Sequence, residues 1–194
     1  MRPPFECVIP AAGASSRMGL WKPLLPWGSS TMIETVIINA IASGLEAIVV
    51  AGFRGGELHS LLDGRPGIHV VDNPGWEEGM LGSILRGAGT VRGEGFFVLP
   101  ADMPLVGVSV FKAMLAACGD GDETLFAACE GRLGHPVCIP ISYLSDLRGL
   151  GPEARLRDFL LARDHRLVET GDSSVLRDLD TQDEYLGALK TRGY

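Results

Sequence analysis

A loop near the amino terminus combines small residues with two cations, a composition suited to binding a polyphosphate. It runs from Pro10 to Pro26 (PAAGASSRMGLWKPLLP) and contains Arg17 and Lys22. Small side chains let the backbone approach a ligand closely, so that its N–H groups can point at phosphate oxygens. The loop is not a Walker A motif, because Gly19 is followed by Leu-Trp instead of a Lys-Ser or Lys-Thr pair. It also lacks the Gly-x-Gly-x-x-Gly fingerprint, which disfavours a nicotinamide-dependent dehydrogenase.

Two acidic residues much further along the chain have the chemistry to hold a divalent cation. Asp102 follows the apolar run Phe96–Leu99, and Asp180 follows Val175–Leu179, and both runs are predicted to be strands. Hard cations such as Mg²⁺ prefer oxygen ligands and keep several waters, so one or two carboxylates are enough. If both strand ends lie at one sheet edge, the two aspartates form a magnesium site.

Asp180 has a second interpretation, as the N-cap of the helix that follows it. Thr181 competes for that role, because both residue types are favoured caps. Asp178, two residues earlier, has the same side-chain parity on a strand and is the reserve candidate for the metal.

The elements that must position these residues are read from hydrophobic patterning. Strands are predicted at Phe5–Ala11, Ala47–Val50, Ile68–Val71, Phe96–Leu99, Leu125–Cys129, Pro136–Ile139 and Val175–Leu179. Helices are predicted at Met32–Ser43, Glu57–Leu62, Gly79–Ala88, Val108–Ala117, Ser142–Leu147, Glu153–Ala162 and Gln182–Thr191. This alternation predicts one α/β domain over residues 1–194, a Rossmann-like three-layer sandwich whose mostly parallel sheet has helices on both faces. Ligands of such sheets bind at the carboxyl ends of the strands.

The composition of the chain disfavours some binding partners and some cellular locations. The chain has 194 residues and a formal net charge of −7, which disfavours a general nucleic-acid binder because phosphate backbones need a basic stripe. Its cysteines form no C-x-x-C pair and are predicted to be reduced, mostly buried thiols: Cys7, Cys118, Cys129 and Cys138. No apolar run reaches roughly 18 residues and no leader-like segment begins the chain, so we expect no membrane association and a cytoplasmic location.

The order of the motifs resembles one known family. Ala11-Ala12-Gly13-x-Ser15-Ser16-Arg17-Met18-Gly19, followed by Lys22 and Leu24-Leu25-Pro26, is similar to the opening signature of the MobA-like nucleotidyltransferases. Five further stretches fit the same family: VAGFRGGELH (50–59), DNPGWEEGMLGSI (72–84), LPADMPLV (99–106), GHPV (134–137) and LRDLDTQDE (176–184). Within the family the chain looks most like the molybdenum cofactor cytidylyltransferases, which implies a fold of the nucleotide-diphospho-sugar transferase type.

The resemblance implies a reaction and the residues for it. CMP would pass from CTP to a molybdopterin-type cofactor with release of pyrophosphate, and a molybdenum hydroxylase would receive the product. Arg17, Lys22 and Asp102 would be catalytic, and Asp102 and Asp180 would hold Mg²⁺, with Mn²⁺ as a substitute ion. The nucleotide would contact Ala11, Ala12, Gly13, Ser15, Arg17, Lys22, Asn73, Gly79 and Ser83.

The acceptor side is implied by two further segments. His135 in GHPV would border the acceptor pocket, and the alternative is a histidine whose nitrogens bond to neighbouring backbone. Many relatives carry Gly-Asp-x-Gly-Ala-Arg near Gly151, whereas this chain has no aspartate there. Its arginine is either Arg155 or Arg157.

Three other functions remain open. A guanylyltransferase of the same family would use GTP, and a broader relative would use a sugar phosphate as acceptor. A non-catalytic module that binds a nucleotide and delivers the cofactor to molybdenum hydroxylases would bind CTP without magnesium-dependent turnover.

Overall fold

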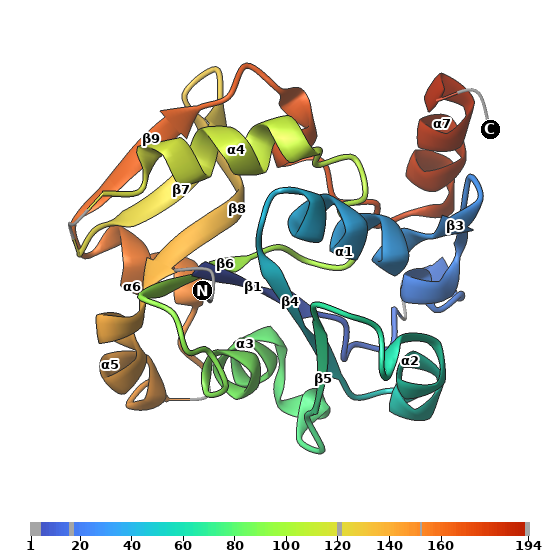
Figure 1. Ribbon diagram of the computed structural model, residues 1–194, viewed down its shortest axis with the longest axis horizontal. Helices are drawn as coiled ribbons and strands as arrows, with labels where there is room; N and C mark the ends of the chain where they lie inside the picture. The colour runs from blue at the N-terminus through green and yellow to red at the C-terminus, as the bar shows by residue number, and fades with distance from the viewer. Residues whose placement is uncertain (1–4, 16–17, 120–121, 152, 193–194) are drawn as a thin grey trace.

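A seven-stranded sheet forms the centre of the protein (Figure 1), whose computed structural model describes residues 5–15, 18–119, 122–151 and 153–192. From one edge to the other the strands are β5 (Ile68–Asp72), β4 (Glu46–Ala51), β1 (Phe5–Pro10), β6 (Gly95–Val98), β8 (Arg132–Pro140), β7 (Thr124–Cys129) and β9 (His165–Glu169). Both pairings of β8 are antiparallel and the others are parallel. The start of β8 therefore lies at the edge where the other strands end.

Both faces of the sheet are apolar and covered by helices. In β1, Cys7 and Ile9 belong to the core on one face, and Val8 belongs to the core on the other. The first face packs against α1 (Met32–Ala42), α2 (Gly55–Leu62) and α4 (Val108–Ala117). The second packs against α3 (Met80–Ala88), α5 (Leu144–Arg148) and α6 (Leu156–Leu161). Figure 1 shows α1 and α4 on one side of the sheet and α3 and α5 on the other, which confirms the predicted three layers.

The loop after β1 continues into a short hairpin that introduces the first helix. A 3-10 turn (Lys22–Leu24) leads to β2 (Pro26–Trp27) and β3 (Ser30–Thr31). Thr31 caps α1: its hydroxyl accepts the Glu34 N–H at 3.3 Å, and the Glu34 carboxylate accepts the Thr31 N–H at 3.0 Å. This reciprocal capping box explains why α1 begins where its sequence predicts.

The prediction of a strand at Val175–Leu179 is wrong. The segment begins as a 3-10 turn, Ser173–Leu176, and its remaining residues belong to no strand. Val175 is fully buried, and its carbonyl lies 2.2 Å from the place where a Cβ on Gly134 would sit. The apolar side chains of this run therefore pack in the core beside β8, and its backbone does not pair with a neighbouring strand.

The last strand is β9, which the sequence pattern did not indicate. β9 lies at the sheet edge, pairs with β7 and has a mostly exposed sequence, HRLVE. An edge strand that buries few side chains lacks the apolar run used to recognise a strand. The chain ends with α7 (Gln182–Arg192), which lies beside β3 in Figure 1 and packs Tyr185 on Trp27. In the described ranges, no helix has the length and apolar character needed to span a membrane.

Candidate functional site

A cavity of about 330 Å³ opens at the carboxyl ends of β1 and β6, where the sheet rule places ligands. We call it the Lys22 cavity. It is lined by Pro10, Ala11, Gly13, Ala14, Ser15, Lys22, Pro23, Met80, Pro100, Ala101, Asp102 and Asp180. The structure therefore brings the amino-terminal loop and both predicted carboxylates together. Ala12, which the resemblance also assigns to the nucleotide, is buried behind its neighbours.

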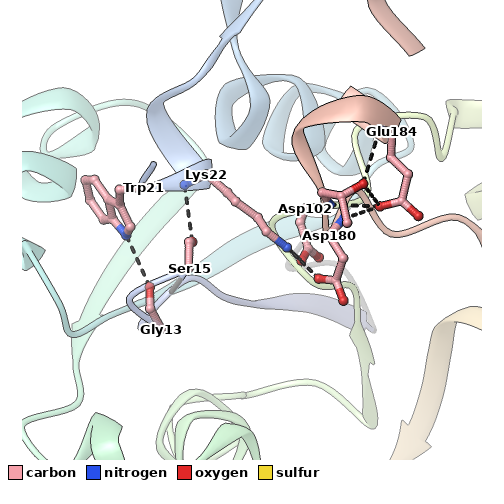
Figure 2. Close-up of polar contacts among 8 residues, drawn as sticks. Gly13, Ser15, Trp21, Lys22, Asp102, Asp180 and Glu184 are labelled. Atoms are coloured by element: carbon pink, nitrogen blue, oxygen red, sulfur yellow. Dashed lines mark hydrogen bonds and ion pairs between the residues drawn. The ribbon is translucent and has the colours of Figure 1, made fainter. Parts of the chain in front are cut away.

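Two hydrogen bonds fold the loop so that Lys22 returns to the sheet edge (Figure 2). The Trp21 indole Nε1 donates to the Gly13 carbonyl at 3.2 Å, and the Lys22 N–H donates to the Ser15 hydroxyl at 3.2 Å. Ser15 has φ of +54°, a left-handed backbone conformation that is uncommon outside glycine. Arg17, the other predicted cation, lies outside the described residues.

The Lys22 ammonium lies between the two carboxylates, as Figure 2 shows. Its Nζ is 2.9 Å from Asp102 Oδ2 and 2.6 Å from Asp180 Oδ1. Burial lowers the pKa of Lys22, but the hydrogen bonds and charges of Asp180 and Asp102 outweigh burial and raise the pKa above its usual value. Lys22 is therefore a permanent cation at neutral pH, held by residues 80 and 158 positions away.

The position of Asp180 follows from two local interactions. The N–H of Leu179 donates to the backbone carbonyl of Asp102 at 3.0 Å, which brings the two aspartates to one place without a strand. Thr181 caps α7, because its hydroxyl accepts the Glu184 N–H at 3.3 Å and the Glu184 carboxylate accepts the Thr181 N–H at 2.8 Å. The capping role thus belongs to Thr181, and the Asp180 carboxylate faces Lys22.

Asp178 lines a second cavity of about 350 Å³, together with Asp102, Asp180 and His135. We call it the bridging cavity. Burial raises the pKa of the Asp178 carboxyl, and the nearby charges of Asp180 and Asp102 raise it further. The Asp178 carboxyl therefore interacts electrostatically with the other two aspartates. It is not, however, among the residues that line the Lys22 cavity.

A third cavity, of about 400 Å³, lies beside the start of β8; we call it the His135 cavity. Its walls are mainly apolar and come from α3, α6, β7 and β8, with Arg155 and Arg157 also lining it. Burial lowers the pKa of His135, the Asp102 charge opposes that effect, and the Arg157 charge adds to it. His135 is therefore neutral at pH 7 and within electrostatic reach of the Lys22 site.

Asn73, Ser83 and Gly79 are not among the residues that line the Lys22 cavity. The Asn73 side-chain amide donates to the Ser83 hydroxyl at 3.0 Å and accepts the Gly75 N–H at 3.2 Å, and both Asn73 and Ser83 are buried. Gly79 has φ of +109° and lines the His135 cavity. These three residues shape the turn into α3.

Met80 is a site residue that the sequence did not indicate. It follows Gly79, is 59% exposed, and borders the Lys22, bridging and His135 cavities. An exposed methionine where three cavities meet is positioned to contact a ligand in any of them. The only sequence signal was its place between Gly79 and the apolar positions of α3.

The oxygen donors at the Lys22 cavity fit a hard divalent cation. Asp102 and Asp180 each place an oxygen within 2.9 Å of the same ammonium, so a positive charge is already held between them. The described residues contain no group of three or more acidic, histidine or cysteine side chains arranged for a metal. A magnesium-type ion takes one or two carboxylates and completes its shell with water and phosphate oxygens, so the two aspartates are enough for it.

A loop cation held between two carboxylates at the carboxyl ends of parallel strands suits a protein that binds phosphate groups. The chain belongs to the MobA-like nucleotidyltransferases, whose domain model matches residues 7–167. It is 33% identical to the molybdenum cofactor cytidylyltransferase of Escherichia coli over 184 residues, 95% of both chains. A molybdenum cofactor guanylyltransferase of Xanthomonas euvesicatoria is 31% identical over 113 residues, 58% of this chain and 54% of that protein.

The solved structures agree with the fold. A nucleotidyl transferase from Methanothermobacter superposes with a TM-score of 0.83 at 25% identity, covering 96% of both chains. The predicted nucleotide-diphospho-sugar transferase fold is thus confirmed, and the protein is a nucleotidyltransferase.

Proposed function

We propose that this nucleotidyltransferase moves CMP from CTP to a molybdopterin-type cofactor and releases pyrophosphate. The observation that carries the proposal is the Lys22 ammonium, held 2.9 Å from Asp102 and 2.6 Å from Asp180 beside a small-residue loop. The similarity to the cytidylyltransferase of Escherichia coli over 95% of both chains supports the choice of nucleotide and acceptor.

In this proposal the triphosphate occupies the Lys22 cavity. Backbone N–H groups of the loop that contains Gly13 and Ser15 bind phosphate oxygens, and Lys22 neutralises charge near the α-phosphate. Arg17 is assigned to the β- and γ-phosphates from the sequence. Asn73 and Ser83 act indirectly, because their hydrogen bond holds the turn that presents Gly79 and its neighbour Met80.

Asp102 and Asp180 are the residues that would hold Mg²⁺, or Mn²⁺ in its place. With Lys22 they carry a net charge of −1, and a bound dication would reverse that sign and screen the phosphate oxygens of the nucleotide. Asp178 remains the reserve ligand from the bridging cavity.

The transfer step needs positioning more than proton chemistry. A terminal phosphate oxygen of the acceptor forms a bond to the α-phosphorus of CTP, the bond from that phosphorus to the β-phosphate oxygen breaks, and its electron pair leaves with pyrophosphate. The attacking phosphate is ionised at neutral pH, so no general base is required. The His135 cavity, joined to the Lys22 cavity at Met80, would hold the acceptor.

The test is pyrophosphate release from CTP with Mg²⁺ and the molybdopterin-type cofactor. Lys22→Met should lower the rate more than about 100-fold, because removing a preorganised charge from a transfer site has effects of that size. Lys112→Met, on the exposed face of α4, removes the same charge away from the site and should keep the wild-type rate. Equal rates for wild type and Lys22→Met would reject the proposal.

A second candidate is transfer of GMP from GTP, because a guanylyltransferase is 31% identical over 58% of the chain. Competition between CTP and GTP in the same assay separates the two. A higher kcat/KM for GTP would replace CTP with GTP in the proposal. Binding of either nucleotide without pyrophosphate release would indicate a delivery module.

A further inference from the structure

We propose that Trp21 is a positioning residue that sets the direction of the anion-binding N–H groups in the loop after β1. The proposal rests on the proposed function in taking the triphosphate as the ligand of this loop. Trp21 itself does not line the Lys22 cavity. Its effect on a ligand would therefore pass through the backbone that it holds.

The Trp21 ring is fixed in place on several sides. It is 6% exposed and packs edge-on against Phe53, with ring centroids 6.3 Å apart and an interplanar angle of 77°. The Arg54 guanidinium lies 4.9 Å from the ring centroid, which is a cation–π contact. From this fixed ring the indole Nε1 donates to the Gly13 carbonyl at 3.2 Å.

The segment after β4 holds Ala12, the residue before Gly13, by a second hydrogen bond to a backbone carbonyl. The Phe53 N–H donates to the Ala12 carbonyl at 2.9 Å. Gly52 permits this approach, since a Cβ there would lie 2.8 Å from the Ala12 Cβ and 2.6 Å from the Trp76 Cβ. Two consecutive carbonyls, of Ala12 and Gly13, are therefore bonded to one support made of Trp21 and the segment after β4.

Peptide geometry converts these two bonds into a direction for the N–H groups. In a trans peptide the N–H of the next residue points opposite to the C=O. With the Ala12 and Gly13 carbonyls bonded to the support, the N–H groups of Gly13 and Ala14 point away from it. Gly13 and Ala14 line the Lys22 cavity, whereas Phe53 and Trp21 do not. Two successive N–H groups aimed into a cavity form an anion-binding nest.

Trp27 provides a matched control for the loss of the indole N–H. It is 2% exposed and packs on Tyr185 with ring centroids 6.2 Å apart. Its Nε1 has no hydrogen-bond partner among the described residues, in contrast to the Nε1 of Trp21. Trp21→Phe and Trp27→Phe make the same chemical change, but the first alone removes a bond to the loop.

The experiment measures the affinity of inorganic tripolyphosphate and of CTP by calorimetry for wild type, Trp21→Phe and Trp27→Phe. We expect Trp21→Phe to weaken both about fivefold to tenfold, the effect of losing one orienting hydrogen bond. Trp27→Phe should bind as wild type does. The KM of the acceptor should stay unchanged in Trp21→Phe, because the loop does not line the His135 cavity. Wild-type affinity in Trp21→Phe would overturn the positioning role and leave the proposed function standing.

A second measurement keeps the proposal testable even if Trp21→Phe does not fold. In ¹⁵N-labelled wild type, tripolyphosphate should shift the amide resonances of Gly13 and Ala14 more than those of Phe53 and its neighbours. Unmoved Gly13 and Ala14 resonances at saturating tripolyphosphate would overturn the proposal. If Trp21→Phe weakens tripolyphosphate binding but the wild type transfers no nucleotide, the proposed function fails and the role of Trp21 stands.

Discussion

The Lys22 and His135 cavities share Met80 as a lining residue but differ in the polarity of their walls and in the elements that supply them. The Lys22 cavity carries its polar groups on loops that follow β1 and β6 and on the segment before α7. Each charge there has a partner, as the Lys22 contacts with Asp102 and Asp180 show. The His135 cavity has mainly apolar walls supplied by α3, α6, β7 and β8.

The difference reflects the direction of β8. The parallel strands end at one edge, and the loops that follow β1 and β6 place Lys22 and Asp102 there, which suits a charged ligand. Antiparallel β8 starts at that edge, so its first residues, Leu133 and His135 among them, contribute side chains from a strand instead of from a loop. We infer that the parallel half handles the charged part of the reaction and that the β8 side supplies shape and apolar surface.

The largest expected effect tests which carboxylates belong to the charged half. Asp180→Asn should lower transfer by about 100-fold and raise the Mg²⁺ concentration needed for half-maximal rate, because it removes a charge in direct contact with Lys22. Asp178→Asn is the matched control, since it removes a carboxylate from the bridging cavity only, and should change the rate less than about threefold. A larger loss in Asp178→Asn than in Asp180→Asn would move the metal site toward the bridging cavity.

A smaller effect tests the division between the two cavities. Arg157→Met should raise the KM of the acceptor about tenfold and leave the KM of CTP unchanged, because Arg157 lines the His135 cavity and its charge reaches His135. Arg155→Met is the control, as it removes the same group from the same cavity wall without an effect on His135. A rise in the KM of CTP in Arg157→Met would show that the cavities are not separate in function.

The sequence was sufficient for the charged cavity because its residues sit in local patterns. Lys22 lies in a small-residue loop after a strand, and Asp102 lies three residues after the end of an apolar run, so each position is recognisable within a few residues. The sequence predicted that Asp180 lies near Asp102, but for a wrong reason. The predicted strand before it does not form, and a backbone hydrogen bond from Leu179 to Asp102 brings it to the site.

The sequence was insufficient where a role depends on long-range packing. The walls of the His135 cavity come from residues between positions 78 and 160, and no local pattern shows that they meet. An asparagine in a turn can face a ligand or a core partner, and only the structure reveals that Asn73 bonds to Ser83. The edge strand β9 was missed because its mostly exposed side chains carry no apolar pattern.

The smallest expected effect is a pH dependence of stability from the half-buried His135. Burial and the charge of Arg157 lower the pKa of His135 in the folded protein, with Asp102 opposing them. The unfolded chain then binds a proton at a pH where the folded protein does not. Stability is therefore lost as pH falls below the ordinary histidine value of about 6.5, by at most about 1.4 kcal/mol per pH unit.

His135→Gln should remove this pH-dependent loss of stability. The free energy of unfolding of the variant should therefore fall less than that of wild type between about pH 6.5 and 5. Arg157→Met should show an intermediate slope, because one of the two influences that lower the pKa is gone. Urea unfolding at several pH values measures all three proteins. Parallel curves for wild type and His135→Gln would mean that the His135 cavity admits enough water to hold a charged imidazole. The His135 cavity would then not be apolar in solution, and it would not differ from the Lys22 cavity in the way argued above.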